Sequence, residues 1–376
     1  MKENYEGGSG SGNQSKIIRE NFDRPLMTKL KPILRVLRQG IVVLLITCVL
    51  TEAAFRVYNY FHPSFIFYDS SYNRFRGQPY APNYDRQLNS QGFNDVEFKV
   101  AKDPGTYRIL GLGDSFTFGT LPYQNNYLTL LEEDLNRSGK KVEIINMGIP
   151  GIGPKDYLAM LANEGLKLKP DMVLLSFFIG NDFQAEPETR RLYSYSYVAS
   201  FIYYLVVLKR GFQGRVVVGK TIYHDDVPTF TDDRFLSIES ERSEIYRKQN
   251  QQFQSDLSTA LGYLIQIKRI CDDRHIALVV ALIPDEVQIN RQLQAKVLQA
   301  KSAAASAGDF DFTLPNRLLS GKLKEQNIEV MDLFDTFAQV GTQTVLYKPN
   351  NTHWNIAGNR LAADLIGAKL LQDQLR

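Results

Sequence analysis

The chain has 376 residues, of which 44% are hydrophobic and 23% are charged, and its formal net charge is +3. These fractions are typical of globular proteins, and the balance of charge argues against binding to nucleic acid. The two cysteines and four histidines show no spacing typical of metal ligands, so we expect neither a metal ion nor another cofactor.

The N-terminal part combines a basic segment with a short apolar run. Residues 1–37 begin Gly- and Ser-rich and then become basic, so we expect a partly disordered cytoplasmic tail. The uninterrupted apolar run, 40–51, has 12 residues, fewer than the roughly 20 that span a bilayer. Three interpretations are open: a cleaved signal peptide, a buried helix of a soluble protein, and a membrane anchor over residues 38–61.

The residues around the apolar run favour the anchor. The basic region before it is longer than that of a typical signal peptide. Glu52 and Arg56 would lie one helical turn apart and could pair, and Tyr58, Tyr60 and Phe61 would sit at the membrane interface. The basic flank places the N-terminus in the cytoplasm and the rest of the chain outside.

After the anchor, the pattern predicts a juxtamembrane segment and then alternating strands and helices. Residues 62–104 are rich in Tyr, Asn and Pro and have weak periodicity, so we expect them to be extended. Apolar runs predict strands at 107–112, 142–146, 171–177, 276–283 and 328–331. Helical spacing predicts helices near 123–137, 154–167, 245–272, 292–306 and 355–372. This alternation predicts an α/β domain over 105–376 with a parallel sheet.

An insertion of about 185–245 interrupts the alternation. It holds a Tyr-rich apolar stretch, 192–208, followed by a charged stretch. Three interpretations are open: a helix packed on the core, a lid or substrate-side cap that touches the membrane, and a second transmembrane helix. The third would put the later strands on the wrong side of the membrane.

Segments with polar side chains that could take part in catalysis follow the first three predicted strands, and another precedes the last predicted helix. They are Gly113-Asp114-Ser115, Asn146 to Gly151, Gly180-Asn181-Asp182, and His353. Because ligands bind at the carboxyl ends of parallel strands, we expect these segments to converge. A serine is a weak nucleophile until a base removes its proton, and a histidine can serve as that base.

With these blocks in this order, residues 105–376 resemble the SGNH (GDSL-type) hydrolase family. The resemblance implies a flavodoxin-like three-layer α/β/α sandwich. It implies that Ser115 attacks an ester carbonyl and that His353 takes and returns the proton. It also implies an oxyanion hole made by the N–H groups of Ser115 and Gly151 and the amide of Asn181. Gly151 is preferred to Gly148 because its distance from Asn146 matches the family's spacing.

One departure from the family pattern concerns the residue that orients the histidine. The family places an Asp two or three residues before it, where this chain has Asn351 and Asn350. Three explanations are open. An Asn carbonyl accepts the Nδ1–H of His353, another carboxylate replaces the Asp, or the site is degraded.

The resemblance extends to membrane-tethered members and to alginate-acetylation proteins, which act on exported polysaccharide. We therefore expect a serine ester hydrolase, an O-acetyl esterase, in a bacterial inner membrane with its catalytic domain outside. Its partners would be an ester-bearing small molecule or an acetylated polysaccharide, and the membrane through residues 38–61. The alternatives are an O-acetyltransferase with the same site and a catalytically weak or inactive carbohydrate-binding or scaffold protein.

Overall fold

The computed structural model describes residues 14–61, 76–77, 79–184, 196–203, 205–206, 221–301 and 307–373. Its centre is a five-stranded sheet with the order β4-β3-β5-β6-β7, in which every neighbouring pair is parallel. The strands are β3 (Tyr107–Leu112), β4 (Val142–Asn146), β5 (Met172–Phe178), β6 (Ala277–Ile283) and β7 (Glu329–Asp332). Each begins and ends within one residue of its predicted bounds. The predicted α/β class with a parallel sheet is confirmed.

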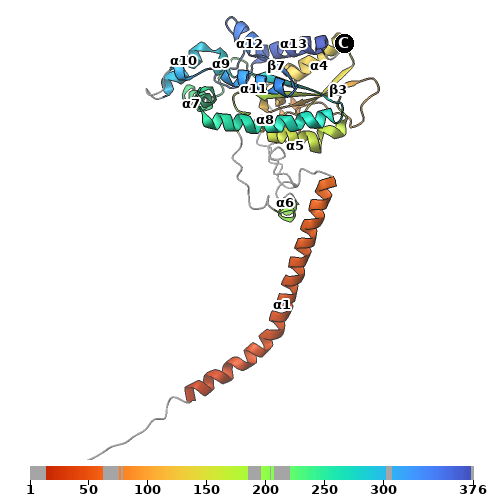
Figure 1. The fold of residues 1–376 in the computed structure, drawn as a ribbon, viewed down its shortest axis with the longest axis vertical. Helices are drawn as coiled ribbons and strands as arrows, with labels where there is room; N and C mark the ends of the chain where they lie inside the picture. Colours follow the sequence, from red (N-terminus) through yellow and green to blue (C-terminus); the bar gives the residue numbers. More distant parts are fainter. Residues whose placement is uncertain are drawn as a thin grey trace, which may run out of the picture.

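Helices cover both faces of the sheet, so the domain has three layers (Figure 1). Along β3, Ile109 packs into a core cluster with α4 (Tyr127–Arg137) and α13 (Ile356–Asp373). The next residue, Leu110, packs on the opposite face with α5 (Pro154–Asn163) and α8 (Gln251–Asp272). Because side chains alternate along a strand and both faces are covered, the strands read as continuous apolar runs.

The remaining described elements are shorter or lie outside these layers. The sequence did not predict α3 (Ser115–Phe118), α7 (Asp232–Arg242), α11 (Leu314–Glu325) or α12 (Phe334–Val340). The others are α6 (Tyr197–Tyr203), α9 (Glu286–Ile289), α10 (Arg291–Ala300) and the hairpin β1 (Pro82–Asn83) with β2 (Arg86–Gln87). Single 3-10 turns occupy Tyr123–Asn125, Gly165–Leu168, Ser243–Tyr246 and Ala307–Asp309.

A long N-terminal helix, α1 (Gln14–Phe61), projects from the domain (Figure 1). Its Pro32–Tyr58 portion is long and apolar enough to cross a membrane, as a membrane anchor or a signal sequence does. The side chains described there from position 32 to 50 are exposed. The predicted anchor, 38–61, lies inside this helix.

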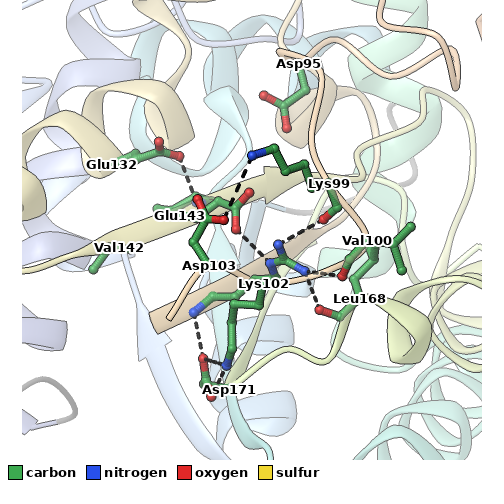
Figure 2. A network of polar contacts seen from close by, with 12 residues as sticks. Asp95, Lys99, Val100, Lys102, Asp103, Glu132, Val142, Glu143, Leu168 and Asp171 are labelled. Carbon is green, nitrogen blue, oxygen red and sulfur yellow. Dashed lines mark hydrogen bonds and ion pairs between the residues drawn. The ribbon is translucent and has the colours of Figure 1, made fainter. Parts of the chain in front are cut away.

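A buried arginine, Arg108, ties the segment before β3 to the base of the sheet. Figure 2 shows the residues that accept its hydrogen bonds, Lys99, Val100, Glu143 and Leu168. The Arg108 guanidinium donates to the backbone carbonyls of Lys99 at 2.9 Å, Val100 at 3.0 Å and Leu168 at 2.5 Å. Its Nε also donates to Glu143 at 2.7 Å. Because every bond goes to an acceptor from another segment, this one side chain fixes the chain's approach to the sheet.

The same segment is also tied to the other end of the strands, where the predicted site lies. Asn94 Nδ2 donates to the carbonyl oxygen of Phe118, the last residue of α3, at 2.8 Å. Asp95 Oδ2 accepts the N–H of the last residue of β4 at 2.8 Å. Closer to α1 in sequence, Arg76 pairs with Glu164 at 2.5 Å. Residues 76–104 are therefore held at several points, although their sequence has weak periodicity.

Candidate active site

The turn between β3 and α3 presents Ser115 at the carboxyl end of the central strands. Gly113 is required there, because a Cβ would lie 2.0 Å from Thr117 Oγ1. The carboxylate of Asp114 caps α3, because it accepts the backbone N–H of Phe116 at 2.9 Å. It is completely buried, and burial raises its pKa to about 6. Its contacts are those of a residue that holds the turn.

The structure brings Ser115 and His353 together although 237 positions lie between them. His353 Nε2 is 2.7 Å from Ser115 Oγ, which is hydrogen-bond distance. The loop that carries the histidine is closed by a bridge between Tyr347 and Trp354. The imidazole lies beside the ring of Phe116, with ring centroids 5.0 Å apart. The nucleophile and base suggested by the sequence are thus in a geometry that permits proton transfer.

Asn351 occupies the position beside the imidazole, and Asn350 does not. Asn351 Oδ1 is 2.7 Å from His353 Nδ1 and also accepts the backbone N–H of His353 at 3.0 Å. A carbonyl oxygen can only accept, so Nδ1 carries the proton and Nε2 is free to face the serine. Asn350 instead donates to the carbonyl of Phe230 at 3.2 Å and to Asp232.

Sequence reasoning missed Thr229, which holds the other end of the Asn351 amide. Asn351 Nδ2 donates to Thr229 Oγ1 at 2.7 Å. The backbone N–H of Thr229 donates to the carbonyl of Pro349 at 3.2 Å, so the threonine is itself fixed to the histidine loop. Thr229 belongs to the insertion and lies 122 positions before Asn351. Hence no local pattern could have revealed the contact.

Arg242 is a second residue that the sequence did not single out. It ends α7, and its guanidinium carbon lies 5.5 Å from the centre of the Phe178 ring. Burial, followed by the positive charge of Arg242, lowers the pKa of His353 to about 3. The imidazole is therefore neutral over the physiological range, which is the form that can accept a proton.

The two other predicted oxyanion donors lie in the loops that follow the strands on either side of β3. The loop after β4 is joined to the serine turn by a bond from Ile149 N to Gly113 O at 3.1 Å. Gly151, further along this loop, is exposed and has a φ of +75°. Asn181 follows β5, and its Oδ1 is buried without a hydrogen-bond partner. Neither residue is hydrogen-bonded to Ser115 in the described part of the chain.

The contacts of Gly148 and Asp182 stabilise the loops that follow β4 and β5. A Cβ on Gly148 would lie 2.1 Å from the backbone nitrogen of Phe118, so this glycine lets the loop after β4 pack against α3. Asp182 accepts the N–H of Phe178 at 2.9 Å and the hydroxyl of Tyr157 at 2.9 Å. Through these contacts Asp182 holds the turn after β5.

Buried acids lie next to Arg242 as well. Glu239 is 3.7 Å from its guanidinium, and burial raises the pKa of both Glu239 and Asp285.

Across the ranges that the structure describes, no group of three or more His, Cys, Asp or Glu side chains could hold a metal ion.

Comparison with known proteins finds a similar family over the C-terminal part of the chain. Residues 241–376 match the family described as SGNH hydrolase-like domain, acetyltransferase AlgX. No curated protein matches the sequence. Among solved structures, the acetyl xylan esterase AlAXEase is similar at 16% identity with a TM-score of 0.41, covering 70% of this chain and 100% of that one. A mutant of an acetyl-xylooligosaccharide esterase from Geobacillus Stearmophilus is similar at 14% identity and a TM-score of 0.40, over 72% of this chain and 96% of that one.

Proposed function

We propose that this chain, which has an SGNH hydrolase-like domain of the AlgX acetyltransferase type, is a serine ester hydrolase that removes O-acetyl groups from carbohydrate. The observation that carries the proposal is the unbroken line from Ser115 Oγ through His353 to Asn351 Oδ1, with both contacts at 2.7 Å. A neutral base against a serine hydroxyl supports acyl transfer through an acyl-serine intermediate.

The reaction begins when His353 Nε2 takes the Ser115 proton as Oγ attacks the acetyl carbonyl. The carbonyl π electrons move to oxygen, and the N–H groups of Ser115 and Gly151 and the amide of Asn181 donate to that oxyanion. The intermediate collapses, the C–O bond to the sugar breaks, and the alcohol oxygen takes the proton from His353. Water then repeats the sequence on the acyl-serine and releases acetate.

Asn351 and Thr229 determine which nitrogen of His353 carries the proton. Thr229 accepts from the Asn351 nitrogen, and this leaves the Asn351 oxygen to accept the Nδ1–H of His353. The arrangement supplies the tautomer that an aspartate usually secures. Asn351 lacks the negative charge with which an aspartate would stabilise the imidazolium. We therefore expect the site to be active, with a lower kcat than a site that has the aspartate.

The second candidate function is transfer of the acetyl group to a sugar hydroxyl. The matching family is described as an acetyltransferase, and this favours transfer. The acyl-serine serves both outcomes, because only the acceptor of the second step differs. A noncatalytic carbohydrate-binding or scaffold role is the third candidate, and the short Ser115–His353 contact argues against it.

We assign α1 the role of a single membrane anchor, over 38–61, with the domain outside a bacterial inner membrane. Its apolar Pro32–Tyr58 portion and the basic residues before it support this topology. The accessible substrates would then be esters of the cell envelope, including acetylated polysaccharide.

The test uses the full chain in nanodiscs with 4-nitrophenyl acetate as substrate. We expect release of 4-nitrophenol that Ser115→Ala abolishes and that Ser255→Ala, at an exposed position of α8, leaves unchanged. An absence of Ser115-dependent release would overturn the esterase proposal. Acetylated sugar formed on adding an oligosaccharide acceptor would favour the transferase.

A further inference from the structure

The short helix α6 packs against the outer part of α1 through a partly buried polar contact. Glu52 of α1 accepts the hydroxyl of Ser196 at 2.8 Å and the N–H groups of Tyr197 and Val198 at 3.0 Å each. Arg56 donates to the same carboxylate at 2.8 Å. The first N–H groups of a helix have no partner within the helix, so Glu52 supplies acceptors that α6 lacks.

Aromatic contacts extend this polar contact along both helices. The rings of Phe55 and Phe201 have centroids 5.1 Å apart. The guanidinium of Arg56 lies over the ring of Tyr197, 4.7 Å from its centre. The two helices therefore meet through a capped helix end, a pair of aromatic rings and a guanidinium over a ring, which fix where α6 lies along α1.

That position places α6 at the level of the apolar span. Glu52 lies within Pro32–Tyr58, six residues before its end, or about 9 Å along the helix axis at the α-helical rise. Backbone N–H groups at this depth have little water to bond, so they need acceptors from the protein. The Glu52 carboxylate provides them at Tyr197 and Val198.

Exposed apolar residues lie on α6 and shortly after it. Ile202 is 54% exposed and Val206 is 53% exposed. Exposed apolar residues of α1, Val49 and Leu50, lie near Glu52 in the same helix. We infer that α6 is embedded in the outer interface of the phospholipid bilayer, with these apolar residues against lipid. The inference rests on the proposal that α1 is a membrane anchor.

The consequence concerns the insertion, because one segment makes both contacts. Residues 196–203 of the insertion contact α1. Thr229, further along the same insertion, holds Asn351 in the histidine loop. The bilayer is then a partner of the segment that completes the catalytic site.

The experiment measures membrane depth with a fluorescent label on single cysteines. The full chain carries Cys48→Ser and Cys271→Ala, which remove both native cysteines, and is placed in nanodiscs of phosphatidylcholine and phosphatidylglycerol. Labels are attached at Ile202→Cys, at Val43→Cys inside the apolar span, and at Ser255→Cys on an exposed turn of α8. Quenching is measured with nitroxide-labelled lipid and, separately, with aqueous iodide.

We expect lipid nitroxides to quench the Ile202 label at least roughly twofold more than the Ser255 label, and iodide to quench it less. If Ile202 behaves like Ser255 while Val43 is quenched by lipid, the inference is overturned and the anchor stands. If lipid quenches neither Val43 nor Ile202, the anchor and the inference fail together. Protection of Ile202 from both quenchers would indicate a protein partner and overturn the inference.

A substitution at the contact itself gives a second, independent measurement. Glu52→Gln keeps the size of the side chain but replaces one acceptor oxygen by a donor nitrogen. We expect lipid quenching at Ile202 to fall while quenching at Val43 stays constant. Glu133→Gln, on an exposed face of α4, is the matched control and should change neither. An unchanged Ile202 signal in Glu52→Gln would refute the role given to this carboxylate.

Discussion

Replacing Thr229 by valine tests how His353, the proposed base, is held. Valine has nearly the shape of threonine and keeps the backbone bond to Pro349, but it removes the oxygen that accepts Asn351 Nδ2 at 2.7 Å. Without that acceptor the amide can rotate and present nitrogen to His353 Nδ1, which favours the wrong tautomer. The perturbation therefore acts on catalysis through the orientation of one amide.

The expected size of the effect follows from one neutral hydrogen bond. Such a bond contributes about 1 kcal/mol, which corresponds to roughly a fivefold change in the population of the productive orientation. We expect Thr229→Val to lower kcat about five- to tenfold with little change in KM. Thr229→Ser, which restores a hydroxyl, should recover most of the loss.

A double-mutant cycle separates this role from a merely structural one. Aspartate at position 351 has two oxygens, so either orientation accepts the Nδ1–H of His353. We expect Asn351→Asp to raise kcat, and Thr229→Val to cost less than about twofold in that background. The assay is kcat and KM for 4-nitrophenyl acetate, with thermal unfolding of each variant as the control. An equal loss in both backgrounds, or no loss in either, would refute the reasoning.

Three further predictions concern other residues of the site. The positive charge of Arg242 contributes to the lowered pKa of His353, about 3. Arg242→Met should therefore raise that pKa and move the acid limb of the kcat/KM profile to higher pH, whereas Arg137→Met on the surface of α4 should not. Asn181→Ala should reduce kcat about 10²–10³-fold with a smaller change in KM, as measured by steady-state kinetics; an unchanged kcat would remove Asn181 from the oxyanion hole. Gly148→Ala should lower the Tm in thermal unfolding because its Cβ would meet the Phe118 nitrogen at 2.1 Å, while Gly153→Ala, with open space around it, should lower the Tm less.

The strands could be predicted because burial on both faces leaves continuous apolar runs between turn residues. The alternation of strands and helices then implied parallel pairing, and this placed the residues after β3, β4 and β5 at one edge of the sheet. Helix α11 was missed because Pro315 and Gly321 interrupt its apolar spacing at Leu314, Leu319 and Leu323. The roles given to Gly151 and Asn181 remain predictions.

What the sequence could not provide were contacts between distant segments of similar composition. Asn350 and Asn351 are the same residue type side by side, and only the path of the loop directs Asn351 to the imidazole. The φ of +46° at Asn350 turns the chain between them. Thr229 and Arg242 reach the site from the insertion, whose placement depends on tertiary packing rather than on local periodicity.

The Arg76–Glu164 pair joins the chain that follows α1 to the end of α5. A pull on α1 would reach this pair, with its 2.5 Å contact, before it reached Asn94. Asn94 is bonded to the carbonyl that ends α3, so a pull that passed Arg76 would act on the short helix that begins with Ser115. Along the chain, Arg76 and its contact with Glu164 at the end of α5 thus stand between α1 and the turn that carries Ser115.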